Sequence, residues 1–276
     1  MASLKIFTLL HQPPRIKRSS FLFSDLVTGS YSCSGGSWQG DLDGINISRK
    51  NTHSEMRGQY FVWKNLCDRY EYIGFEHQRR KFFLDFMGRN LTPDINSELF
   101  NVRRREAVQK SEQTYPVSSE TFSFYVAQRS TMASEETDHI LDFVGSHDII
   151  CQRPHRGVLV RDLFAGFLGQ EGWDDLIAAI RHVDINNRFD LDAISDTEMG
   201  CYCNMYIMKT SIFHEYMTLW WDVMNHLIEK RGEPDRQMGH FAERLLTLFL
   251  TQKMLSNPML KVGFLPLLFC SNPEGY

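Results

Sequence analysis

Short β-type runs alternate along this chain with longer amphipathic segments, and this alternation restricts the fold more than any other feature. The apolar and β-branched runs cover residues 4–10, 70–75, 147–151, 203–208 and 261–269. Helical periodicity appears over residues 54–70, 173–183, 212–227 and 238–249. We therefore predict an α/β domain with a mainly parallel central sheet flanked by helices. In such sheets ligands collect at the carboxyl ends of the strands.

Two segments interrupt the alternation. Residues 11–50 are rich in Ser, Gly and Asp, which predicts surface loops and turns. Residues 101–137 contain three consecutive arginines at 103–105 and many Ser, Thr and Glu, which predicts a polar, loop-rich excursion. A length of 276 residues, 42% of them hydrophobic, suits one domain over residues 1–276.

Charge, cysteine spacing and missing motifs exclude several classes of protein. The balance of 30 basic against 34 acidic residues argues against a nucleic-acid-binding protein. The six cysteines contain no Cys-x-x-Cys pair, so we expect reduced thiols in the cytoplasm rather than a zinc site. The chain carries no P-loop, GxGxxG, GxSxG or HExxH motif. No run reaches the roughly 18 apolar residues that span a bilayer, and no signal peptide is evident, so any membrane association is expected to be peripheral.

The run 70–75 leads directly into a polar cluster that contains His77, Arg79 and Arg80. Two guanidinium groups and an imidazole at the carboxyl end of a strand can converge on an anion, and the planar guanidinium suits a diphosphate. A solvated basic turn explains the same spacing equally well.

Short polar side chains precede the helix at 54–70. Asn46, Ser48 and Asn51 are typical of helix caps. Alternatively, they form a rim that binds a polyhydroxyl ligand, with Trp63 as a stacking face, although helical spacing favours a core position for this ring.

Acidic residues offer two further kinds of site. Glu243 is a candidate general base if burial raises its pKa, and an ion pair with Arg244 or Arg236 is the alternative. Residues 41–43 and 190–192 match the Asp-x-Asp pattern that divalent ions favour, a pattern that is also common by chance.

Six segments carry a resemblance to a known family. They read LHQP (10–13), NISRKN (46–51), EMRGQYFVWKN (55–65), YIGFEHQRR (72–80), NMYIMK (204–209) and GHFAERLL (239–246). Their order and content resemble a bacterial glycosyltransferase family, long labelled only as a domain of unknown function, that is found in capsular polysaccharide and lipopolysaccharide gene clusters.

The resemblance implies a GT-A-like fold and transfer of a sugar from a nucleotide-sugar donor to a growing surface glycan or a lipid-linked glycan. The residues that the resemblance implies at the nucleotide-sugar donor or its diphosphate are Thr8, His11, Asn46, Ser48, Asn51, Arg79 and Arg80, with the two arginines at the diphosphate. Those implied at the sugar or acceptor are Glu55, Tyr60, Trp63, Asn204 and Arg244. Glu243 and His77 are the implied catalytic residues.

Many GT-A enzymes bind a metal through Asp-x-Asp at the strand end where this chain has its basic cluster. We expect the arginines to neutralise the leaving diphosphate without a metal. Mn²⁺ or Mg²⁺ at Asp41 and Asp43 is the alternative.

The chain departs from the family pattern at Phe61, Gln78 and Cys201, where Trp, Tyr and His are expected. These departures leave a second class of function open, a non-catalytic carbohydrate- or partner-binding module on the same fold. A phosphotransferase that uses the basic cluster is a third alternative.

Overall fold

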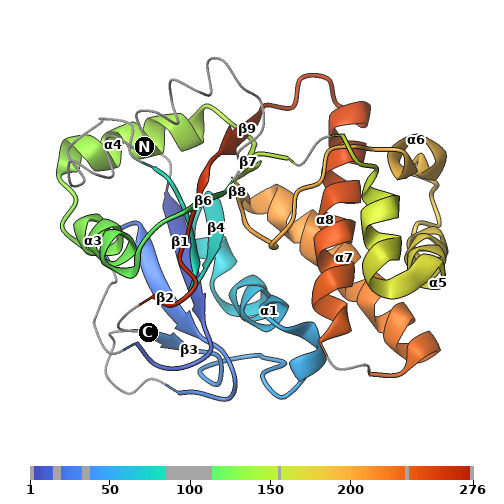
Figure 1. Ribbon diagram of the computed structural model, residues 1–276, viewed down its shortest axis with the longest axis horizontal. Helices are drawn as coiled ribbons and strands as arrows, with labels where there is room; N and C mark the ends of the chain where they lie inside the picture. The colour runs from blue at the N-terminus through green and yellow to red at the C-terminus, as the bar shows by residue number, and fades with distance from the viewer. Residues whose placement is uncertain are drawn as a thin grey trace.

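The computed structural model describes residues 3–14, 20–32, 38–84, 114–154, 157–233 and 236–273. Within these ranges a ten-stranded sheet carries helices on both faces (Figure 1). The strands are β1 (Leu4–Leu10), β2 (Phe23–Val27), β3 (Gln39–Gly40), β4 (Tyr72–His77), β5 (Arg80–Phe82), β6 (Thr114–Pro116), β7 (Ile149–Gln152), β8 (Tyr206–Lys209), β9 (Val262–Leu265) and β10 (Leu267–Phe269). The helices are η1 (Asn51–His53), α1 (Met56–Asn65), η2 (Cys67–Arg69), α3 (Ser119–Ser130), α4 (Ser134–Gly145), α5 (Val160–Val183), α6 (Leu191–Ser195), α7 (Thr210–Arg231) and α8 (Gln237–Ser256).

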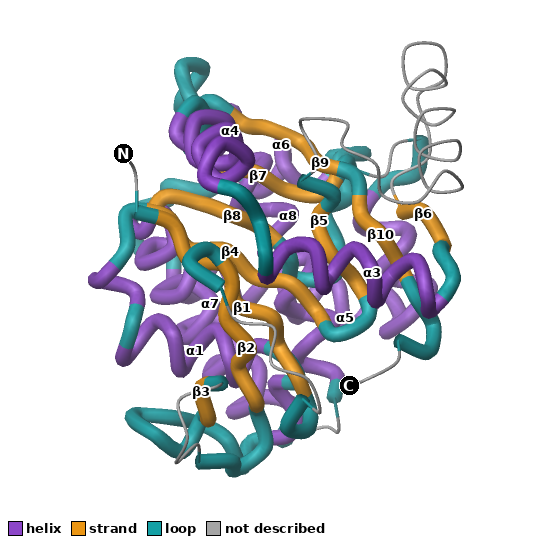
Figure 2. The backbone as a smooth tube through the Cα atoms, turned by 90° about the vertical axis from the view of Figure 1, so that its left-hand side faces the viewer, coloured by secondary structure: helices purple, strands orange, loops and turns teal. Residues whose placement is uncertain are grey.

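The sheet is built around β1, which pairs in parallel with β2 on one side and β4 on the other. Strand β4 also pairs antiparallel with β5 and β8, and β8 continues through β7 to β9 (Figure 2). Five of the nine described pairings are parallel, so the sheet is mixed and mostly parallel. The prediction of an α/β fold with helices flanking such a sheet is confirmed.

Helices α1, α5, α7 and α8 lie on one face of the sheet, and α3 and α4 lie on the other (Figure 1). The larger core joins strands to α7 through aromatic contacts, since the ring of Phe75 lies 5.5 Å from that of Tyr206 and 5.4 Å from that of Phe213. A smaller cluster packs Phe122 and Tyr125 of α3 against β5 and β10. The three layers together hold the strand ends in fixed positions.

Both segments expected to be loops contain regular structure. Residues 11–50 include β2 and β3, where a polar Ser-Asp pair interrupts the apolar run of β2. The described part of 101–137 forms β6, α3 and the start of α4, and residues 101–113 lie outside the described ranges. The helix expected at 173–183 lies in α5, which starts at Val160 and is divided in two by a break at Gly169. The last strand divides into β9 and β10 at Pro266, which has no N–H to donate to a ladder.

A buried ion pair connects the sheet to α3. Glu76 in β4 and Arg129 in α3 lie 2.9 Å apart, and their side chains are 0% and 6% exposed. The other carboxylate oxygen of Glu76 accepts a hydrogen bond of 2.9 Å from the backbone N–H of Phe82. The pair therefore ties α3 to the strand hairpin formed by β4 and β5.

Among the described residues, no helix combines the length and the apolar character needed to cross a membrane.

One buried histidine makes stability depend on pH. His53 in η1 is 0% exposed, its ring meets that of Trp220 edge-on at 5.3 Å, and neither of its nitrogens has a hydrogen-bond partner among the described residues. Burial, aided by the positive charge of Lys50 and Arg57, lowers the pKa of His53 from 6.5 to about 4. The folded state therefore binds fewer protons than the unfolded state between these values, so stability is complete above 6.5 and falls as the pH falls towards 4.

We expect the wild type to lose about 2 kcal/mol more unfolding free energy than a His53→Phe variant when the pH falls from about 8 to about 5. Phenylalanine retains the edge-on contact with Trp220 and cannot be protonated. Urea unfolding of both proteins at the two pH values measures the difference. Parallel pH dependences in the two proteins would contradict this assignment.

Candidate functional site

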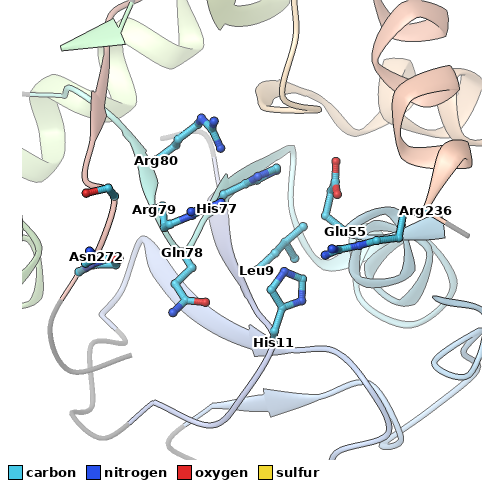
Figure 3. Close-up of a pocket in the computed structure, with 11 residues that line it drawn as sticks. Leu9, His11, Glu55, His77, Gln78, Arg79, Arg80, Arg236 and Asn272 are labelled. Atoms are coloured by element: carbon cyan, nitrogen blue, oxygen red, sulfur yellow. The ribbon is translucent and has the colours of Figure 1, made fainter. Parts of the chain in front are cut away.

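A cavity of about 470 Å³ opens at the carboxyl ends of β1 and β4 (Figure 3). Its lining comes from the strand ends, the turn after β4, the starts of α1 and α8, and the segment after β10. The lining residues are Leu9, His11, Glu55, His77, Gln78, Arg79, Arg80, Arg236, Ser271, Asn272 and Pro273. The position agrees with the general rule that ligands of α/β sheets bind beyond the carboxyl ends of the strands.

The tight hairpin between β4 and β5 holds the basic cluster. His77 pairs with Arg80 across a two-residue turn, Gln78 and Arg79. The carbonyl oxygen of Arg79 accepts a hydrogen bond of 3.0 Å from the N–H of Cys270. Both arginines are thus fixed at the backbone by strand pairing, while their side chains remain accessible to the cavity (Figure 3).

The positive charge of the cavity comes from three arginines in its lining, Arg79, Arg80 and Arg236. Burial lowers the pKa of His77, with Glu55 opposing and Arg80 reinforcing the shift, so this imidazole is neutral at pH 7. The Nε2 atom of His77 has no hydrogen-bond partner among the described residues. The cavity is therefore suited to an anion, and His77 adds a neutral hydrogen-bonding group.

Glu55 is the one carboxylate among the residues that line the cavity. Its Oε1 atom accepts a hydrogen bond of 2.7 Å from Nδ2 of Asn204. The first turn of α8 packs closely beside it, because a Cβ added to Gly239 would lie 3.2 Å from Ser54 and 3.9 Å from Oε2 of Glu55. The carboxylate is therefore held in one position beside the arginines.

A strained dipeptide positions two carboxylates. Cys203 and Asn204, just before β8, have φ angles of 70° and 48°, a left-handed conformation that is uncommon for residues other than glycine. Asn204 holds Glu55, and the N–H of Cys203 donates a hydrogen bond of 2.9 Å to Oε1 of Glu243. Strain of this kind persists only where the surrounding structure enforces it, and it concentrates at functional sites.

The expectation that Glu243 is a general base with a raised pKa is not met. Burial raises the pKa of Glu243, but the hydrogen bond from His240, the charge of Arg244 and the N–H of Cys203 outweigh burial and lower it. The Glu243 carboxylate also lies outside the lining of the cavity. Its ion pair with Arg244 is the alternative that the sequence left open.

The structure brings five of the sequence-predicted site residues together around the cavity. They are His11, Glu55, His77, Arg79 and Arg80. Asn204 lies behind them and contacts the cavity only through Glu55. The roles assigned to these residues remain predictions.

Several other residues predicted to bind the sugar donor instead form hydrogen bonds with the protein itself. Thr8 is buried, and its hydroxyl accepts a hydrogen bond from Lys81. Asn46 closes its own turn through the carbonyl of Gly44 and the N–H of Ser48. Arg57 donates hydrogen bonds of 2.7 Å to the Ser48 carbonyl and to Oδ1 of Asn51. The structural interpretation of the 46–51 segment, as a local loop, fits these contacts better than a ligand rim.

The aromatic residues of α1 also lie away from the cavity lining. Tyr60 is buried and packs against Trp221. Trp63 donates a hydrogen bond to His214, and the ammonium of Lys64 lies 3.3 Å from its ring centre. Helical spacing favoured a core position for Trp63. The ring does pack against the core, at its edge, where it is partly buried.

The lining residues that sequence reasoning did not assign to the site are Leu9, Gln78, Arg236 and the segment 271–273. Arg236 follows the Gly232-Glu-Pro-Asp break and has a left-handed φ of 56° at the start of α8. The available signal in the sequence was a basic residue directly before a predicted helix. Nothing in the local sequence marks residues 271–273.

The Asp-x-Asp candidate for a metal is engaged in its own loop. Asp41 is 0% exposed and accepts hydrogen bonds from the N–H groups of Gly29, Ser30 and Tyr31. Asp43 accepts a hydrogen bond from the N–H of Gly40. With Glu55 as the one carboxylate beside three arginines, the lining of the cavity does not fit a divalent cation.

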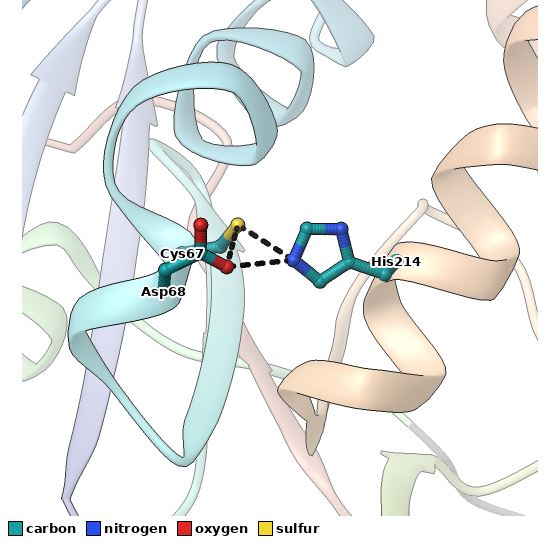
Figure 4. Close-up of side chains that lie close together, drawn as sticks. All are labelled: Cys67, Asp68 and His214. Atoms are coloured by element: carbon teal, nitrogen blue, oxygen red, sulfur yellow. Dashed lines mark hydrogen bonds and ion pairs between the residues drawn. The ribbon is translucent and has the colours of Figure 1, made fainter.

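A second group of metal-donor side chains, Cys67, Asp68 and His214, lies on the α1 side of the fold (Figure 4). Trp63 donates a hydrogen bond of 3.0 Å to Nδ1 of His214, which leaves the ring proton on Nε2, 2.9 Å from Asp68. A metal-bound histidine instead uses its second nitrogen as a donor. Burial also raises the pKa of the Cys67 thiol to about 12. The contacts fit a hydrogen-bond network rather than a metal centre.

The structure is thus an α/β protein with a cavity lined by three arginines at the carboxyl edge of a mixed sheet. The chain belongs to the family described as a domain of unknown function, DUF4422, whose model matches residues 5–254. The sequence resemblance is confirmed to that extent. No curated protein sequence matches the chain.

The fold is similar to the apo structure of the WbbM bifunctional glycosyltransferase, with a TM-score of 0.69 and 22% sequence identity. The match covers 98% of this chain and 46% of that one, so the chain spans about half the length of the solved structure. This similarity shows a glycosyltransferase-like fold.

Proposed function

We propose that the protein is a glycosyltransferase that binds the diphosphate of a nucleotide-sugar donor in the cavity and transfers the sugar to a surface glycan. The observation that carries the proposal is a single cavity, at the carboxyl ends of β1 and β4, whose lining contains Arg79, Arg80 and Arg236 together with one carboxylate, Glu55. The similarity of the fold to WbbM and the order of the sequence motifs support it.

In this proposal the arginines compensate the charge that develops on the leaving diphosphate. One guanidinium group can bind two phosphate oxygens through two parallel hydrogen bonds, and it stays charged at every accessible pH. Charge stabilisation by groups already in position is among the largest contributions to catalysis. The cavity volume, about 470 Å³, is within the range of small-molecule sites.

Glu55 is the proposed general base. The acceptor hydroxyl oxygen would form a bond to the anomeric carbon of the donor sugar while the bond from that carbon to the diphosphate breaks. The hydroxyl proton passes to the Glu55 carboxylate, and the diphosphate leaves toward the arginines. This assignment replaces Glu243, whose carboxylate is paired with Arg244.

The proposal predicts that one of UDP, GDP, CDP or TDP raises the melting temperature of the protein in the presence of EDTA. Arg79→Ala should weaken that binding by about tenfold or more, since a charge-assisted hydrogen bond contributes about 1.5–3 kcal/mol. Thermal shift titrations with and without Mn²⁺ measure both effects. The matched control is Arg181→Ala, an exposed arginine in the last turn of α5, which should leave the shift unchanged.

No stabilisation by any nucleoside diphosphate would overturn the transferase proposal and favour a binding module. Stabilisation only with Mn²⁺ would retain the transferase and contradict a diphosphate site built from arginines.

A further inference from the structure

An exposed aromatic ring lies on the α5 side of α8, beyond the cavity. Phe167 in α5 is 66% exposed, although its ring is stacked on that of His240 in α8, with centres 6.0 Å apart and planes 18° apart. The guanidinium of Arg244 lies 5.5 Å from the centre of the Phe167 ring and 4.8 Å from that of Tyr202. We call the stacked rings of Phe167 and His240 the platform. His240 covers one face of the Phe167 ring, and the other face is open to solvent.

The backbone of α5 breaks next to this ring. Gly169 has φ 74° and ψ 167° inside the helix, which divides it two residues after Phe167. A Cβ at Gly169 would touch nothing within 4 Å, so packing does not require the glycine there, but the backbone conformation does. The Phe167 ring stands in water, and a ligand stacked on it would offset the cost of that exposed apolar surface.

A carboxylate stands beside the platform. The Glu243 side chain is 18% exposed, pairs with Arg244, and has Oε2 3.9 Å from Nδ1 of His240. Arg244 itself is 5% exposed and fixes the direction of the carboxylate. An open ring with a fixed, ionised acceptor beside it matches the two surfaces of a sugar, which are an apolar C–H face and a rim of hydroxyl donors.

The platform follows the cavity along one helix. Arg236 directly precedes α8, and the helical rise places His240 and Glu243 about 6 Å and about 10 Å further along its axis. His240 and Glu243 are three residues apart and therefore share a side of α8. Adjacent residues, Cys203 and Asn204, anchor Glu243 and Glu55. The platform therefore begins about one sugar ring beyond the cavity.

We propose that Phe167, His240 and Glu243 form a binding site for a neutral sugar ring of the acceptor glycan, with Arg244 as a positioning residue. This inference rests on the proposed function, because it assigns the cavity to the donor and the adjoining platform to the acceptor. The carboxylate disfavours an anionic occupant such as a nucleotide, and the stacked rings favour a ring-shaped one.

The test is saturation-transfer NMR on the full chain with methyl α- and β-hexopyranosides as probes, in the presence of each nucleoside diphosphate. We expect at least one glycoside to bind the wild type. Phe167→Ala should weaken binding by about tenfold, and Phe167→Tyr, which keeps the ring, should restore it. The matched control is Phe21→Ala, because Phe21 is a phenylalanine of similar exposure, 75%, in another part of the surface.

Loss of glycoside binding in Phe167→Ala, with binding retained in Phe21→Ala, supports the site. Failure of every glycoside to bind the wild type, or equal binding to wild type and Phe167→Ala, overturns it. The nucleotide titration separates this result from the parent proposal. If no diphosphate binds while Phe167→Ala still abolishes glycoside binding, the transferase proposal fails and the sugar site stands.

Discussion

Glu55→Gln is expected to lower the rate of nucleoside diphosphate release from the donor by about 10²–10⁴, because a positioned general base contributes a factor of this size. Glutamine keeps the shape of the side chain and cannot take the acceptor proton. Nucleoside diphosphate binding should persist, since the arginines that hold the diphosphate are unchanged. Slow hydrolysis of the nucleotide sugar, with water as acceptor, measures the rate without a known glycan.

The comparison that decides between carboxylates is Glu243→Gln. We expect a smaller loss of hydrolysis there, because its carboxylate is paired with Arg244 and its pKa is lowered. Glu171→Gln, at an exposed position of α5, is the control for a change of charge alone. A larger loss in Glu243→Gln than in Glu55→Gln would return the general base to Glu243.

Arg129→Met is expected to destabilise the fold by about 3–5 kcal/mol, the largest change in stability that we predict. The substitution leaves the carboxylate of Glu76, which is 0% exposed, without its guanidinium partner 2.9 Å away. Methionine still fills the space over the ring of Phe23, which the guanidinium covers at 3.5 Å. The loss is therefore electrostatic, and denaturant unfolding measures it.

Removing the charge should reverse most of this loss. Glu76→Gln combined with Arg129→Met retains an oxygen for the N–H of Phe82 and removes both charges of this pair. The matched exposed pair is Arg161 and Asp196, with side chains 43% and 62% exposed, where Arg161→Met should cost less than about 1 kcal/mol. Equal losses at the two pairs would mean that burial does not determine the effect.

The sequence predicted the elements whose signals are local. The apolar run before His77 ends abruptly in polar residues, and the structure has β4 and its turn there. Helices α7 and α8 match their periodic segments because their apolar faces are continuous. Strand ends, and hence the basic cluster, could be placed by the same reasoning.

Features that depend on distant partners could not be predicted. Helix α3 was expected to be a loop, since part of its buried face is Arg129, whose partner Glu76 is 53 residues away. Glu55 lines the cavity and Glu243 does not, and both carboxylates are held by the left-handed residues before β8, Cys203 and Asn204. No periodicity in the sequence indicates that left-handed conformation. Arg236 joins the cavity only because α8 packs beside Glu55.

The segment that follows β10 affects how the protein should be engineered. Residues 271–273 line the cavity, and Cys270 is hydrogen-bonded to the turn that carries Arg79. An affinity tag or fluorescent protein inserted directly after Pro273 would therefore begin at the lining of the cavity. Reporters attached ahead of β1 leave that entrance clear, and they are the better choice for ligand titrations and for immobilisation on a sensor surface.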